Sequence, residues 1–112
     1  MNIHLTDKKC VACEGGVPAL SSEQCTEYSE QVPEWSIAED EKSISRKFTF
    51  KDFKEALAFV DKVGVIAEDE GHHPDMNLFG YKNVLITLST HAIGGLSEND
   101  FIVAAKIDLL QK

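Results

Sequence analysis

The stretch KDFKEALAFVDKVGVIAEDEG, residues 51–71, decides how the rest of the chain can be arranged. The period of an amphipathic helix is visible in its apolar positions, which are separated by four, three, four and three residues: Phe53, Leu57, Val60, Gly64 and Ala67. Ala56, Phe59 and Val63 stand beside this row. Gly71 is the natural end of this helix, because glycine readily adopts the left-handed conformation that closes one. The pattern predicts a helix over residues 51–70 whose apolar row faces a core.

Short alternations of apolar and polar residues flank this helix on both sides. Upstream, residues 44–50 alternate, and a polar turn over 39–42 separates them from a shorter alternation around Trp35 and Ile37. Downstream, residues 76–79 lead through a turn near Gly80 to a second alternating run that ends at His91. A period of two residues is typical of strands with one buried face, so each side of the helix predicts a β-hairpin.

Two further helices complete the expected order of elements. Ser21 or Ser22 can cap a short helix that runs to about Gln31. Ser97 begins the last helix, in which Asp100 is an acid at the third helical position. The resulting order, α-β-β-α-β-β-α, predicts an α+β fold: a four-stranded antiparallel sheet with three helices packed on one face.

Length and charge restrict the class of protein. The 112 residues suit one domain, which we place at residues 21–112, and the preceding residues 1–20 carry no period and are interpreted as an N-terminal arm. Nineteen acidic against eleven basic residues give a formal charge of -8, which argues against nucleic acid as a partner. No apolar run approaches the ~20 residues of a membrane span. With no secretory signal at Met1, we expect a cytoplasmic protein without membrane contact.

Three cysteines lie in the first quarter of the chain: Cys10, Cys13 and Cys25. An odd number in so short a segment is a poor disulfide framework, so reduced thiols in a flexible arm are the preferred interpretation. The alternative is a zinc site that adds His4 to these thiols, although the second CxxC pair or spaced histidine pair of such sites is missing.

The unusual chemical feature is Gly71-His72-His73-Pro74, with Glu68 one turn earlier and His91 at the end of the last strand. Imidazole has an unperturbed pKa of about 6.5 and can give or take a proton near neutral pH. Residues before proline favour extended backbone, so His72 and His73 should point in different directions and not share a metal ion. The HExxH spacing of helical zinc ligands is also missing, and no metal is predicted.

Each of these residues, taken alone, also has an ordinary structural explanation. A histidine pair in a loop is commonly a solvated surface feature, and Glu68 lies in the acidic run of residues 68–70. Asp100 has the capping role described above. Trp35 and Tyr81 are large enough to be core residues.

Their joint spacing favours a functional explanation. Reading forward, the chain has Glu68, three residues, His72-His73-Pro74, six residues, Tyr81, nine residues, His91, eight residues and Asp100. This pattern resembles the signature of the pterin-4a-carbinolamine dehydratase family, as do the segments FKDF (50–53), ITLSTH (86–91) and GLSE (95–98). The resemblance extends from about Pro33 to the C-terminus, and residues 10–18 are similar to the N-terminal arms of bacterial members.

The resemblance implies a hydro-lyase that dehydrates a 4a-hydroxytetrahydropterin to the quinonoid dihydropterin, in recycling the pterin used by an aromatic amino acid hydroxylase. Neither a metal nor an organic cofactor is implied. By the same resemblance, His72 and His73 are expected to transfer protons, and His91 is expected to bind or polarise the pterin.

The resemblance also implies supporting roles and partners. Glu68 would orient a histidine, Asp100 would belong to the site, and Trp35 would stack on the pterin ring. A homodimer or homotetramer is implied, with an aromatic amino acid hydroxylase as a physiological partner. The alternative function is a protein-interaction module, because vertebrate members also serve as dimerisation cofactors of a homeodomain transcription factor.

Overall fold

Four antiparallel strands form one sheet in the order β1-β2-β4-β3. The strands are β1 (Ser36–Ile37), β2 (Ile44–Thr49), β3 (Asp75–Phe79) and β4 (Asn83–Leu88). Three α-helices accompany them: α1 (Ser22–Ser29), α2 (Phe53–Glu70) and α3 (Glu98–Asp108). Short 3-10 helices lie at η1 (Leu5–Asp7), η2 (His91–Ile93) and η3 (Leu109–Gln111). The computed structural model describes residues 5–8, 10 and 19–111.

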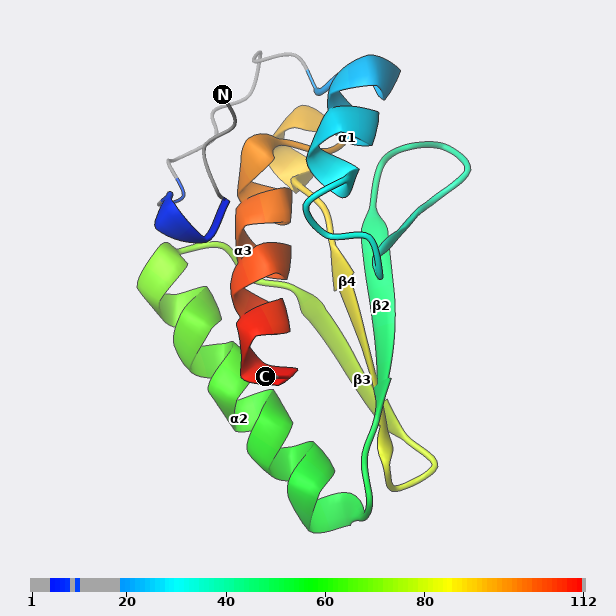
Figure 1. Ribbon diagram of the computed structural model, residues 1–112, viewed down its shortest axis with the longest axis vertical. Helices are drawn as coiled ribbons and strands as arrows, with labels where there is room; N and C mark the ends of the chain where they lie inside the picture. Colours follow the sequence, from blue (N-terminus) through cyan, green and yellow to red (C-terminus); the bar gives the residue numbers. More distant parts are fainter. Residues whose placement is uncertain (1–4, 9, 11–18, 112) are drawn as a thin grey trace.

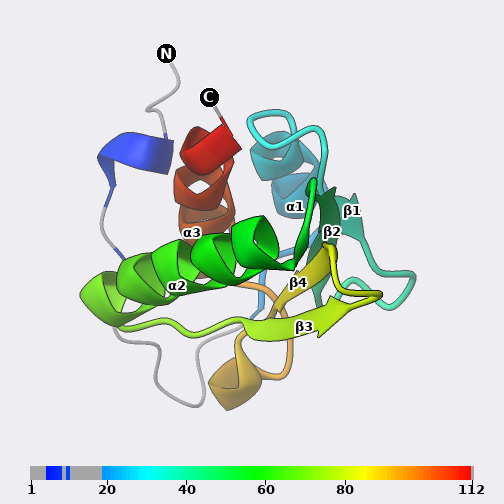
Figure 2. The ribbon, with the colours of Figure 1, turned by 90° about the horizontal axis from the view of Figure 1, so that it is seen from below.

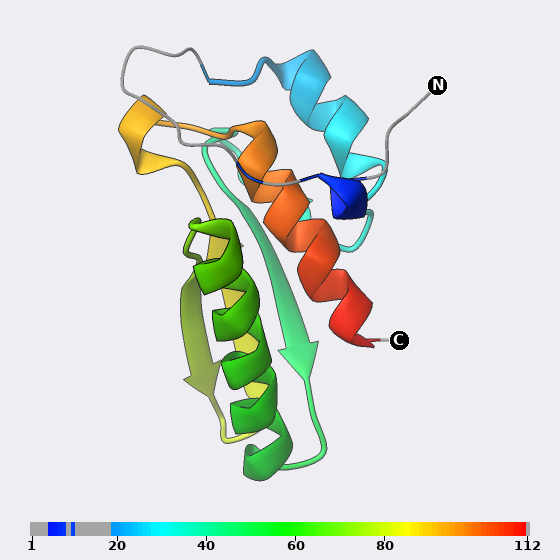
Figure 3. The ribbon, with the colours of Figure 1, turned by 90° about the vertical axis from the view of Figure 1, so that its left-hand side faces the viewer.

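All three α-helices cover the same face of the sheet. Figure 2 shows α1, α2 and α3 on one side of the strands, and Figure 3 shows α2 crossing that face lengthwise. The order of elements runs helix, strand, strand, helix, strand, strand, helix (Figure 1). The predicted α+β architecture and its single helical layer are confirmed.

The two faces of the sheet differ as the alternating pattern predicts. Along β4 every second residue is buried, and these side chains face the helices: Val84, Ile86 and Leu88. Ile44 and Phe48 of β2 extend this buried surface across the sheet. Burial of such side chains, worth about 1.5–3 kcal/mol each, is what holds the helices on this face.

Helix α2 is buried along a different row from the predicted one. Its buried positions are Ala56, Phe59, Val63, Ala67 and Glu70. Phe53 and Leu57 are 49% and 45% exposed, so the expectation that they belong to the core-facing row is wrong. The predicted end is confirmed, since Gly71 has a φ of 66°.

Helix α3 is buried on nearly all sides because it lies between the sheet, α2 and the N-terminal segment. Residues 101–105 and Ile107 are all buried. Its predicted start is confirmed: the backbone N–H of Ser97 donates to Asp100 Oδ2 at 2.9 Å. Ser21 caps α1 in the same way, since its backbone N–H donates to Gln24 Oε1 at 2.9 Å.

The described part of the N-terminal arm packs on the domain. Leu5 is 1% exposed and belongs to the core, and its backbone N–H donates to Gln31 Oε1 at 3.0 Å. Lys8 forms an ion pair with Glu98 at the start of α3. No helix among residues 5–8, 10 and 19–111 is long and apolar enough to cross a membrane.

The two large aromatic residues considered as core differ from each other. Trp35 is 5% exposed, packs edge-on against Phe48 and lies in the core, which agrees with its ordinary structural explanation. Tyr81 is 60% exposed, so its assignment to the core is wrong. It occupies the tight turn between β3 and β4, where both Gly80 and Tyr81 adopt left-handed backbone.

Candidate active site

A buried carboxylate holds the first histidine of the pair. His72 Nε2 lies 2.6 Å from Asp100 Oδ1, and the side chain of Asp100 is 0% exposed. The other carboxylate oxygen of Asp100 accepts hydrogen bonds from Thr90 Oγ1 at 2.8 Å and from the Ser97 backbone N–H at 2.9 Å. Asp100 therefore caps α3 with one oxygen and positions His72 with the other.

This network fixes His72 more firmly than one hydrogen bond could. Asp100 is on the first turn of α3, where the positive end of the helix dipole stabilises a carboxylate. Thr90 is 5% exposed and its hydroxyl also hydrogen-bonds to Ser97 Oγ at 2.8 Å. A histidine whose Nε2 is engaged by a carboxylate keeps Nδ1 for proton exchange, and the carboxylate stabilises the ring when it becomes positive.

The second histidine has a carboxylate partner on the surface. His73 Nε2 lies 2.6 Å from Glu68 Oε1, and their side chains are 61% and 80% exposed. Glu68 lies on the last turn of α2, and the left-handed turn at Gly71 lies between it and His73 in the sequence. The two adjacent imidazoles thus turn to different partners, one inside and one outside, as the pre-proline argument predicts.

The third histidine reaches the same end of the sheet by another path. Residues 72–74 lead directly into β3, whereas His91 follows directly after β4 at the start of η2. Because β3 and β4 pair antiparallel, the entry of one strand and the exit of the other are neighbours. His91 is exposed, next to Thr90 of the Asp100 network, and lines a pocket of about 300 Å³.

The structure does not bring Trp35 to the histidines within this chain. Its Nε1–H donates to Asp108 Oδ1 at 2.8 Å, at the C-terminal end of α3. Asp100 and Asp108 are eight residues apart, about 12 Å along a helix. The indole is closed in by the core, so a pterin has no access to its faces from solvent here.

Two residues of this region were missed by sequence reasoning. Thr90 continues the alternation of buried residues in β4, and this pattern predicts that its side chain faces inward. The pattern does not predict the hydrogen bond from the Thr90 hydroxyl to Asp100. Glu70 was expected on the surface with its acidic neighbours. It is only 8% exposed and forms an ion pair with Lys106. Its position follows from the buried row of α2, three residues beyond Ala67.

The thiols that the structure describes are not arranged as a metal site. Cys25 is buried, and Cys10 donates its backbone N–H to Glu70 Oε1 at 2.9 Å. Burial and the Glu70 carboxylate raise the pKa of Cys10 to about 12, which disfavours the thiolate. Among residues 5–8, 10 and 19–111, no three metal-ligating side chains are grouped together. His4 and Cys13 lie outside the described residues, and the proposed arm zinc site is untested there.

Known proteins are similar to this chain over most of its length. The family model for pterin 4 alpha carbinolamine dehydratase matches residues 18–110. A relative from Halorhodospira halophila is 50% identical over 106 residues, covering 95% of this chain and 96% of its own length. One from Rubrobacter xylanophilus is 47% identical over 106 residues, covering 95% and 97%. Both carry names that assign them to this dehydratase.

Solved structures share the fold. The crystal structure of a transcriptional coactivator/pterin dehydratase from Brucella melitensis superposes with a TM-score of 0.78 and 30% identity, covering 84% of this chain and 99% of that one. A pterin dehydratase-like protein described as a RuBisCO assembly factor in the alpha-carboxysome has a TM-score of 0.57 and 28% identity, covering 68% and 87%.

The fold and the family match together define a small α+β lyase, an enzyme that removes water from its substrate. The chain belongs to the pterin 4 alpha carbinolamine dehydratase family, as the sequence resemblance indicated.

Proposed function

We propose that this protein dehydrates a 4a-hydroxytetrahydropterin to the quinonoid dihydropterin by histidine acid/base catalysis. The observation that carries the proposal is the contact between His72 and the fully buried Asp100, backed by Thr90 and Ser97. A solvated histidine with no role in catalysis does not require a buried carboxylate that is itself held by two further hydrogen bonds.

The reaction requires two proton transfers and no change of oxidation state. The C4a–O bond breaks, and the departing hydroxyl takes a proton from an acid and leaves as water. A ring nitrogen gives its proton to a base, and the electron pair of that N–H bond forms the new C=N bond. One proton enters and one leaves, so two imidazoles of opposite protonation state suffice.

The different surroundings of the two histidines favour different roles. His72 suits the base, because Asp100 stabilises the positive ring that forms when it accepts the pterin proton. His73 suits the acid, because it is 61% exposed, can be reprotonated from solvent and has the Glu68 carboxylate beside its charged form. His91 is proposed to bind or polarise the pterin. Trp35 has no part in the proposal, since its ring is buried.

The cellular setting is proposed from the family. We infer that the protein acts in the cytoplasm, in recycling the pterin of an aromatic amino acid hydroxylase, as a homodimer or homotetramer. The unpaired edge of β3 supports an oligomer, because Met76 and Phe79 on this edge strand are 38% and 39% exposed.

A protein-interaction role is the second candidate. It is favoured by exposed apolar side chains on α2: Val65 is 70% exposed, and Phe53 and Leu57 are exposed nearer the start of the helix. The similar Brucella protein is titled a coactivator as well as a dehydratase. A partner whose binding survives replacement of all three histidines by alanine would support this candidate.

The direct test is stopped-flow absorbance with freshly generated carbinolamine. The wild-type protein should accelerate water loss well above the buffer rate, and His91→Ala should weaken pterin binding. A wild-type rate equal to that of buffer alone contradicts the proposed activity. Unchanged pterin affinity in His91→Ala contradicts only the role of that residue.

A further inference from the structure

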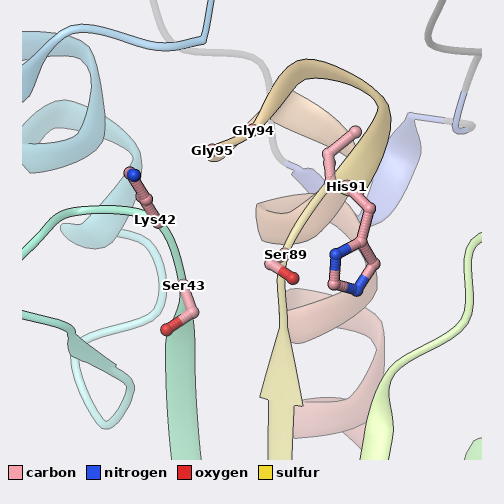
Figure 4. A pocket seen from close by; sticks show the side chains of 7 residues that line it. Lys42, Ser43, Ser89, His91, Gly94 and Gly95 are labelled. Carbon is pink, nitrogen blue, oxygen red and sulfur yellow. The ribbon is translucent and has the colours of Figure 1, made fainter.

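The pocket beside His91 has two walls from different parts of the sheet. Figure 4 shows Lys42 and Ser43, just before β2, on one side and Ser89, His91, Gly94 and Gly95 on the other. Ser43 precedes and Ser89 follows the last paired residues, Ile44 and Leu88, so the two serines stand across from each other. The volume of about 300 Å³ suits a small molecule or a substituent of one.

Three hydrogen-bond donors in this lining have no side-chain partner among the described residues: Lys42, Ser43 and Ser89. Thr90 differs, because its hydroxyl is engaged by Asp100 and Ser97. The backbone N–H groups of the glycines are also used, since Gly94 donates to His91 and Gly95 to Thr90. An ammonium and two hydroxyls are therefore available to a ligand that accepts hydrogen bonds.

The charge of the pocket is opposite to that of the chain. Acidic residues outnumber basic ones by nineteen to eleven, yet none of the described residues that line this pocket is acidic, and one is a lysine. The nearest acids in sequence are turned to other partners: Asp40 accepts the Lys42 backbone N–H, and Glu41 accepts the Ser22 hydroxyl. Among the described lining residues, Lys42 supplies the ammonium that an anion can contact.

We propose that this pocket receives an anionic substituent of the pterin substrate, a phosphate or carboxylate, and that Lys42 is the residue that selects for it. The proposal rests on the proposed function, in which His91, a lining residue of this pocket, binds or polarises the pterin. The ring would lie against the histidines while its substituent extends past His91 and Ser89 toward Lys42.

The test compares fluorescent oxidised pterins that differ only in the substituent at C6: a methyl group, a neutral polyhydroxyalkyl chain, and the same chain carrying a phosphate. Fluorescence titration of the wild-type protein should give the tightest binding for the phosphorylated compound. Lys42→Ala should weaken that compound about three- to tenfold and leave the methyl compound unchanged, as expected for one exposed charge-assisted contact.

Lys47→Ala is the matched control, because Lys47 is an exposed lysine of β2 that does not line the pocket. It changes the net charge equally and should leave all three affinities unchanged. Lys42→Gln repeats the test if Lys42→Ala does not fold, as judged by circular dichroism. Equal affinities of the wild type for the three compounds, or an equal loss in both lysine variants, overturn the proposal.

Failure of this inference is distinguishable from failure of the proposed function. If the methyl-substituted carbinolamine is dehydrated while Lys42 adds nothing to the affinity for the phosphorylated compound, the proposed activity is supported and the proposed selectivity is contradicted. If the wild type binds none of the pterins and accelerates no dehydration, both proposals fall.

Discussion

Two ion pairs of the same length lie on opposite sides of one short segment. His72 to Asp100 and His73 to Glu68 both measure 2.6 Å, but the first pair has side chains 12% and 0% exposed and the second 61% and 80%. Water screens the outer pair, whereas the inner pair interacts in a less polarisable setting and is held by further hydrogen bonds. The strength of these two contacts therefore depends on their burial and their further hydrogen bonds, because their distances are equal.

The largest effect is expected from Asp100→Ala. The change leaves the Thr90 hydroxyl and Ser97 backbone N–H without their carboxylate and frees His72. Unfolding free energy should fall by about 2–4 kcal/mol, because a helix cap and buried hydrogen bonds are lost together. The dehydration rate constant should fall by about 10²–10⁴, the range for one acid/base group. Urea denaturation and stopped-flow assays measure the two effects.

Ser97→Ala separates the two roles of Asp100. It removes the hydroxyl that contacts Thr90 but keeps the backbone N–H that Asp100 accepts. A modest loss of stability with near-normal activity is expected. If Asp100→Ala loses stability and keeps the wild-type rate, Asp100 is only a cap.

His72→Ala should reach a similar loss of rate at a smaller cost in stability. The rate constant is expected to fall by about 10²–10⁴, because the base is removed while Asp100 keeps its bonds to Thr90 and Ser97. Single-turnover stopped flow on the folded variant provides the measurement. A rate within twofold of wild type would assign His72 to structure alone.

Most of the fold could be predicted because each element carries its own period or cap. The alternation of β4 and the Ser97 start of α3 are local signals, and the structure follows both. The rotation of α2 was mispredicted because Phe53 and Leu57 are apolar enough to join the core row, and only packing against α3 decides which row is buried. Long-range contact, not propensity, fixes that choice.

The site was predictable as a set of residues but not as a geometry. The histidines and acids follow from their spacing, whereas the pairing of His72 with Asp100 spans 28 positions and depends on how α3 lies beside α2. The same holds for Glu70 and Lys106, an ion pair between those helices. Stacking by Trp35 was expected from its chemistry, and the core position of that ring could be known only from the fold.

His73→Ala should lower the rate less than His72→Ala, by about 10²-fold, the lower end of the acid/base range. Its ring is exposed, so a small buffer acid can reach the vacated space and deliver the proton in its place. Addition of imidazole buffer should restore part of the rate in His73→Ala and none in His72→Ala. Equal rescue of both variants, or a wild-type rate in His73→Ala, would break the contrast between the two sides.

The smallest effect is expected from Glu68→Gln. This change keeps an oxygen near His73 Nε2 but removes a carboxylate that is 80% exposed, so solvent and salt already weaken its contribution. The rate should fall two- to fivefold, and the urea midpoint should stay at the wild-type value. The residual effect should shrink as ionic strength rises, which a salt series in the same assay measures. A loss as large as that of Asp100→Ala would mean that the outer carboxylate shares the work of the inner one, for instance by being covered in an oligomer.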